Sequence, residues 1–231
     1  MIYDKLDNQT IKFLEELQSD YNIDFVEKEI DYCEVFQKNG NATIYYNPKI
    51  IDTETITHEL LHIWLNKFNY TIGNYIYIFT NTHPKLQRVF NKFLCDNIEN
   101  FFDHYKMYPK YKEMGYSPEK FIKNGLEEQC SIKDINRISI KFLNTYNSNS
   151  INLFIGCLLS IYADHVEHNY EEHLRLMHQK DKELFIIVTK FWRTLEEFDI
   201  TNIEENQNLD IEICENLVAD MESWIENKKI K

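Results

Sequence analysis

Residues 53–68 read TETITHELLHIWLNKF and contain two histidines four positions apart. Apolar residues recur in this stretch with a helical period, and Thr53 can cap its start, so we expect a helix. Side chains at positions i and i+4 lie on the same face of an α-helix. The imidazoles of His58 and His62 can therefore converge on one metal ion, with the carboxylate of Glu59 beside a metal-bound water.

A short β-strand is expected just before this helix. Asn39-Gly40-Asn41 is a turn sequence, and β-branched and aromatic residues follow it as far as Pro48, which cannot donate a ladder hydrogen bond. The predicted strand consists of Ala42, Thr43, Ile44, Tyr45 and Tyr46. Together with the helical patterns elsewhere in the chain, it predicts an α+β fold.

The rest of the chain is predicted to be mainly helical. Residues 70–82 fit either a strand or an aromatic loop, and a helix is expected from about residue 84 to Tyr108, where Pro109 ends it. A polar linker at 145–150 precedes three amphipathic helical patterns, over residues 151–168, 170–198 and 208–228. We therefore expect a first domain over 1–145 and a helical C-terminal region over 150–231.

Composition limits the classes of partner and compartment. The chain of 231 residues has 38 acidic and 25 basic side chains and a formal net charge of −13, which disfavours nucleic acid and anionic membranes as partners. Its five cysteines include no CxxC pair, and its N-terminus has no basic segment followed by an apolar run. We expect a cytoplasmic protein with scattered reduced thiols.

The strand, the HELLH helix and a later acidic helix resemble the zincin metallopeptidases over about residues 42–121. Glu99 and Asp103 are four positions apart, which is similar to the ExxxD motif of the gluzincins. The resemblance implies a zinc site of His58, His62 and Glu99, in which Asp103 orients a ligand histidine. It also implies that Glu59 is the general base, and then the proton donor to the leaving amine, in hydrolysis of a peptide bond.

The predicted strand has two interpretations. In zincins an edge strand beside the active-site helix pairs with extended substrate, and residues 42–46 hold the matching position in this sequence. An internal strand, with no role in substrate binding, fits the same residues equally well.

The third metal ligand is also open. His104 follows Asp103 directly, and three histidines make an equally good zinc site. His104 lies about 140° around the helix from Glu99, so the two side chains cannot face one metal ion without distortion. We prefer Glu99 and keep His104 as the alternative.

Two classes of function remain. The first is a zinc peptidase acting on a peptide or protein substrate, similar to small cytoplasmic bacterial and phage-associated proteases that cut a repressor. The second is a binding or regulatory module in which HELLH is structural or only holds metal. The acidic stretch 196–226 is either a solvated face or a surface for self-association through the C-terminal helices, and five other polar residues are interpreted as exposed on a charged helix. These residues are Asp164, His165, His168, His173 and His178.

Overall fold

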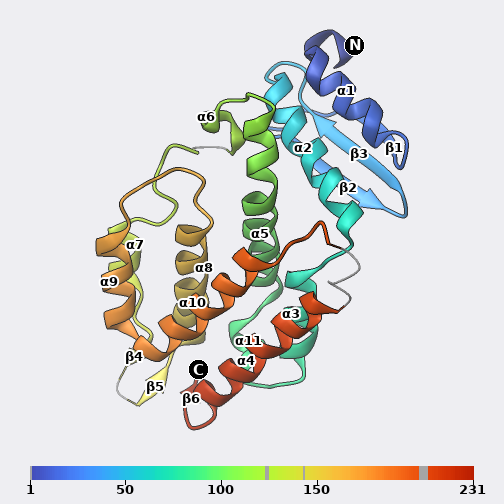
Figure 1. Ribbon diagram of the computed structural model, residues 1–231. Coiled ribbons are helices and arrows are strands. Elements are labelled where there is room, and N and C mark those ends of the chain that lie inside the picture. Colours follow the sequence, from blue (N-terminus) through green and yellow to red (C-terminus); the bar gives the residue numbers. More distant parts are fainter. Residues whose placement is uncertain (1, 123–124, 143, 203–207) are drawn as a thin grey trace. The chain divides into compact units, whose positions relative to one another are not determined.

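The computed structural model describes residues 2–122, 125–142, 144–202 and 208–231. The described chain has a three-stranded sheet near its N-terminus and a mainly helical C-terminal part, which confirms the predicted α+β class (Figure 1). It forms two compact units. The first contains residues 1–69 and 106–126, and the second contains residues 70–105 and 127–231.

The border between the units differs from the expected division at 145–150. Thr145 and Tyr146 form a strand, which pairs in parallel with Lys229 and Ile230 near the C-terminus, so this segment is not a linker. Helices that follow residue 70 pack against C-terminal helices of the second unit and so belong with them.

The first unit combines a small sheet with short helices. Its elements are η1 (Ile2–Lys5), α1 (Asn8–Leu17), β1 (Asn22–Glu27), β2 (Glu34–Lys38), β3 (Asn41–Tyr46), α2 (Thr53–Leu65), η2 (Asn66–Phe68) and α6 (Pro118–Phe121). Helix α2 packs against both α1 and β2. Asp52, rather than Thr53, caps α2, because its carboxylate accepts a hydrogen bond of 2.9 Å from the backbone N–H of Thr55.

Strand β3, the predicted strand of residues 42–46, lies in the middle of the sheet. It pairs in parallel with β1, Ile44 opposite Phe25, and antiparallel with β2, Ile44 opposite Val35. Both sets of backbone hydrogen-bonding groups on β3 are therefore used inside the sheet. The hypothesis that Ala42, Thr43, Ile44, Tyr45 and Tyr46 form a substrate-binding edge is wrong, and the alternative of an internal strand holds.

The second unit is built from helices and a minor sheet. Its elements are α3 (Ile72–Asn81), α4 (Leu86–Val89), α7 (Ile132–Arg137), β4 (Lys141–Phe142), β5 (Thr145–Tyr146), α8 (Ser148–Tyr162), α9 (Glu171–Lys180), α10 (Lys182–Glu197), α11 (Leu209–Ile225) and β6 (Lys229–Ile230). The long helix α5 (Lys92–Glu113) contributes residues 92–105 to this unit and residues 106–113 to the first.

Two segments differ from the sequence prediction. Residues 72–81 form helix α3, although their aromatic and β-branched residues favoured a strand or a loop. Pro109 lies inside α5 and does not end it. A proline removes only its own N–H from the helical ladder, and the helix continues to Glu113 before Gly115, with a positive φ of 78°, ends it.

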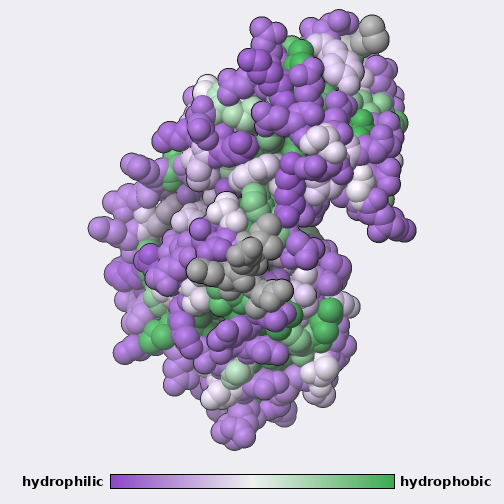
Figure 2. Space-filling view, turned by 45° about the vertical axis from the view of Figure 1, so that its right-hand side comes forward, coloured by the Kyte–Doolittle hydropathy of each residue, from purple (hydrophilic) through white to green (hydrophobic). Residues whose placement is uncertain are grey.

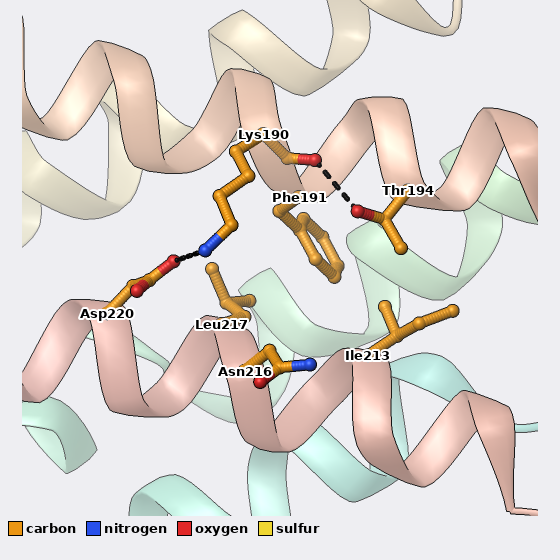
Figure 3. Close-up of a pocket in the computed structure, with 7 residues that line it drawn as sticks. All are labelled: Lys190, Phe191, Thr194, Ile213, Asn216, Leu217 and Asp220. Carbon is orange, nitrogen blue, oxygen red and sulfur yellow. Dashed lines mark hydrogen bonds and ion pairs between the residues drawn. The ribbon is translucent and has the colours of Figure 1, made fainter.

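Helices α10 and α11 pack side by side in the second unit and leave a small groove of about 160 Å³ (Figure 3). Apolar side chains of Phe191, Ile213 and Leu217 line the groove. At one end the ammonium group of Lys190 lies 2.7 Å from the carboxylate of Asp220. The acidic stretch that includes α11 thus has one face packed on α10, and its self-association remains a prediction.

The visible surface is in keeping with the acidic, polar composition. Hydrophilic residues predominate on the face drawn in Figure 2, and hydrophobic residues appear there in small separate groups. Within the described ranges, no helix is both long enough and apolar enough to cross a membrane.

Candidate metal site

Three histidine side chains converge from helices α2 and α5. His58 and His62 lie one turn apart on α2, with ring centroids 5.0 Å apart, and His104 lies on α5. One ring nitrogen from each histidine lies within 4.8 Å of the other two, and all three residues are partly exposed. Nitrogens bound to one zinc ion lie about 3–4 Å apart, because each Zn–N bond is about 2.0–2.1 Å. Small side-chain rotations would therefore be enough to close the triad around an ion.

Aromatic rings of the first unit pack around this site. The ring centroid of Phe121 on α6 lies 5.1 Å from that of His58 and 5.0 Å from that of Tyr108. Phe121 itself is almost fully buried. This contact restricts the rotation of the His58 imidazole, which favours a ligand held in place before a metal arrives.

Glu59 is buried between the two histidines in sequence, with 7% of its surface exposed. Burial raises the pKa of Glu59 to about 7, while the positive charge of protonated His62 and the backbone N–H of Val35 act in the opposite direction. The bond from Val35 ties this carboxylate to β2, the edge strand that contacts α2. Glu59 therefore has the position next to a ligand that the HExxH pattern predicts, together with a partner in the backbone that it does not predict.

Glu99, the preferred third ligand, has a different partner. Its carboxylate accepts a hydrogen bond from the backbone N–H of Gly73, and the N–H groups of Ile72 and Asn74 also act on it. These groups are at the start of α3, where N–H groups lack partners within the helix. Burial and the neighbouring Asp103 nevertheless raise the pKa of Glu99 to about 8.

Gly73 explains how Glu99 reaches this position. A Cβ atom at residue 73 would lie 2.2 Å from the carbonyl oxygen of Cys95 and 3.1 Å from the Cβ atom of Glu99. Only a glycine allows α3 to start this close to the backbone of α5. The close approach places the N–H of Gly73 against the Glu99 carboxylate.

Asp103 also bonds to a residue near α3. Its carboxylate accepts a hydrogen bond of 2.8 Å from the hydroxyl group of Tyr70, and this contact helps burial to raise the pKa of that phenol. Glu99 and Asp103 do share one side of α5, as their spacing predicted, and both contribute to the contacts around residues 70–74. The proposed role of Asp103 in orienting a ligand histidine stays a prediction.

The geometry thus favours the alternative ligand over the preferred one. Among the described residues, His58, His62 and His104 form the group whose ligand atoms come together, and Glu99 is not part of it. The signal was present in the sequence, since His104 lies about 140° from Glu99 around the helix. Which side of α5 meets α2 depends on packing, and the local sequence does not state it.

Comparison of the chain with protein-family models, with curated proteins and with solved structures finds no match. The resemblance to zincins therefore rests on the HELLH residues and on their surroundings in this chain.

Proposed function

We propose that this protein is a zinc-dependent hydrolase in which His58, His62 and His104 bind the metal and Glu59 is the general base. The observation that carries the proposal is the convergence of three imidazole nitrogens from α2 and α5. Three neutral imidazoles are a common ligand set in catalytic zinc sites, and they leave the fourth position to water or substrate. Zinc is preferred because imidazole suits it and because a tetrahedral site needs no further protein ligand.

Each residue has a defined task in this scheme. Bound zinc supplies a Lewis acid that polarises the scissile carbonyl and lowers the pKa of a coordinated water to about 7. The Glu59 carboxylate takes a proton from the attacking water and then gives it to the leaving amine. Phe121 holds the His58 ring in place through its contact of 5.1 Å between centroids.

We propose a peptide bond as the bond that is cleaved, on the basis of the HELLH helix next to a small sheet. The correction to β3 changes how substrate would be held, because its backbone groups pair with β1 and β2. The scheme therefore needs no substrate contact from residues 42–46.

Metal content tests the proposal directly. Purified full-length protein is loaded with zinc, dialysed, and analysed by atomic emission. Wild type should retain about one equivalent, and His58→Ala, His62→Ala and His104→Ala should each lose it. His178→Ala, a substitution on α9 in the second unit, is the matched control and should keep the metal. Full retention of zinc in all three ligand variants would contradict the proposed site.

One observation favours a second candidate function, a metal-binding module without hydrolytic activity. The Glu59 carboxylate is bonded to the backbone N–H of Val35, and a general base must leave or share this bond when it takes a proton. Screening the zinc-loaded protein against a peptide library distinguishes the two functions. Zinc binding without cleavage of any peptide supports the module, and cleavage that depends on Glu59 supports the hydrolase.

A further inference from the structure

Two thiols of the second unit lie next to each other, far from the histidine site in sequence. Cys130 directly precedes Ser131, the N-cap of α7, and Cys157 lies within α8. Both cysteines are free, and a hydrogen bond joins their side chains. Cys130 is 4% exposed, whereas Cys157 is partly exposed and so within reach of small molecules.

The backbone on either side of this pair is held by further contacts. The N–H of Gln129, next to Cys130, donates a bond of 3.0 Å to the hydroxyl group of Tyr170. That hydroxyl group in turn donates a bond of 2.6 Å to Asp164, which follows the end of α8. The segment before α7 and the region at the end of α8 are therefore connected independently of the cysteines.

Asp164 organises this region. Its side chain is 2% exposed, and it interacts with the Nδ1 atom of His168 at 2.7 Å and accepts a bond from the N–H of Val166 at 3.1 Å. Residues 164–170 form a loop and no helix, so the interpretation of Asp164 and His165 as exposed on a charged helix is wrong. His173, on the first turn of α9, is also buried, and its Nε2 atom lies 3.4 Å from Glu128.

The hydrogen bond between the thiols makes the two sulfur atoms unequal. The Cys130 S–H donates to the Cys157 sulfur, which lowers the pKa of Cys157 against the opposing effect of burial. The same bond and burial raise the pKa of Cys130. A cysteine with a lowered pKa and partial exposure is the more reactive partner, because the thiolate is the nucleophile.

We propose that Cys130 and Cys157 form a reversible disulfide when the protein meets a two-electron oxidant such as hydrogen peroxide, with Cys157 as the attacking thiolate and Cys130 as the resolving thiol. This redox site is independent of the proposed metal site and does not require hydrolytic activity.

The chemical steps balance. The Cys157 thiolate attacks one peroxide oxygen, the O–O bond breaks, and the departing hydroxide takes the thiol proton of Cys130 to become water. The Cys130 thiolate then attacks the sulfur of the resulting sulfenic acid, the S–O bond breaks, and the second oxygen leaves as water after taking up a proton. Overall, two thiols and one hydrogen peroxide give one disulfide and two water molecules.

The other three cysteines provide internal controls. Burial raises the pKa of Cys33, Cys95 and Cys214, so their thiols should react slowly at neutral pH. Cys33 is the closest match to Cys157, because both side chains are partly exposed.

The test treats the full-length wild-type protein with one equivalent of hydrogen peroxide at pH 7, blocks the remaining thiols, and maps a tryptic digest by mass spectrometry. We expect one cross-linked peptide pair that contains Cys130 and Cys157, a fall from five titratable thiols to three, and full recovery after treatment with dithiothreitol. In the untreated protein, iodoacetamide should modify Cys157 at least about tenfold faster than Cys33, since one pKa unit changes the thiolate fraction about tenfold.

Variants identify the role of each sulfur. Cys130→Ser should stop the reaction at the sulfenic acid of Cys157, which dimedone labels, and Cys33→Ser should form the disulfide as wild type does. The absence of a Cys130–Cys157 cross-link in oxidised wild type would overturn the proposal, and so would equal alkylation rates at Cys157 and Cys33. Both measurements use the wild-type chain, so they decide the question even if a variant does not fold.

Discussion

Two buried carboxylates, Glu59 on α2 and Glu99 on α5, invite comparison because the sequence assigned both to one metal site. Burial raises the pKa of each, to about 7 for Glu59 and about 8 for Glu99. Glu59 lies between two histidines of the converging triad, whereas Glu99 accepts a bond from the first turn of α3 at Gly73. The same residue type at a similar degree of burial is thus placed beside candidate ligands in one region and at a helix N-terminus in the other.

The difference shows what residue spacing can establish. Both patterns, HELLH and ExxxD, place two side chains on one face of a helix, and the structure has both pairs on one face. The face that carries His58 and His62 meets an imidazole from another helix, and the face that carries Glu99 and Asp103 meets Gly73 and Tyr70. The predictions below test whether the first region is chemical and the second structural, beginning with the largest expected effect.

The largest effect is expected at Glu59. Glu59→Gln should lower the rate of peptide hydrolysis by about 10²–10⁴-fold, because an amide cannot take the proton from water, while the zinc content stays the same. The rate is measured with a fluorogenic peptide, and Glu15→Gln on the exposed side of α1 is the control. A Glu59→Gln variant as active as wild type would show that another site or a contaminant does the chemistry.

The second prediction compares the two candidate third ligands. His104→Ala should weaken zinc binding by more than the roughly 10–100-fold that is typical of residues which only support a ligand, and Glu99→Gln should leave the affinity nearly unchanged. Competition with a chromogenic chelator measures both affinities. The opposite result, with zinc lost in Glu99→Gln and kept in His104→Ala, would restore the glutamate as the ligand.

The third prediction concerns pH and the start of α3. A pKa raised from the ordinary 4.5 to about 8 means that folding favours the protonated form of Glu99. The stabilisation from this group is complete below about pH 4.5 and is lost as the pH rises through about 8. Its full size is a few kcal/mol, since one pKa unit corresponds to about 1.4 kcal/mol.

Urea denaturation between pH 5 and pH 9 measures this effect. The free energy of unfolding of wild type should fall with pH relative to that of Glu99→Gln, whose side chain does not titrate. Asp103 also lies near Glu99 and stays present in both proteins, so the difference isolates the glutamate. Parallel curves for the two proteins would mean that Glu99 is ionised in the folded state throughout this range.

The smallest effect is expected at two glycines. Gly73→Ala should destabilise the protein by about 1–3 kcal/mol, because the new methyl group would lie 2.2 Å from the Cys95 carbonyl oxygen. Gly156→Ala on α8 is the matched control. Its methyl group meets Leu94 at an ordinary 3.7 Å, and replacing a glycine within a helix should stabilise the protein by up to about 1 kcal/mol. Equal effects of the two substitutions would show that α3 and α5 are not in close contact at Gly73.

Local sequence was sufficient for several features. Repeating apolar residues and polar caps predicted the helix of residues 53–65, and the turn at Asn39-Gly40 followed by β-branched residues predicted the strand of residues 41–46. The i, i+4 spacing of His58 and His62 by itself determined that their imidazoles share one helical face, because helix geometry fixes that relation within four residues.

Only the tertiary structure decided the remaining features, since each depends on segments far apart in the chain. Residues 72–81 became helical against their strand propensity where Glu99 meets the N–H of Gly73 and Asp210 accepts a bond of 3.2 Å from the N–H of Thr71. The position of β3 inside the sheet was decided by its pairing with β1, and the choice of His104 over Glu99 by the face of α5 that lies near α2. A helical or extended pattern states which side chains share a face, and the packing of distant elements determines what that face meets.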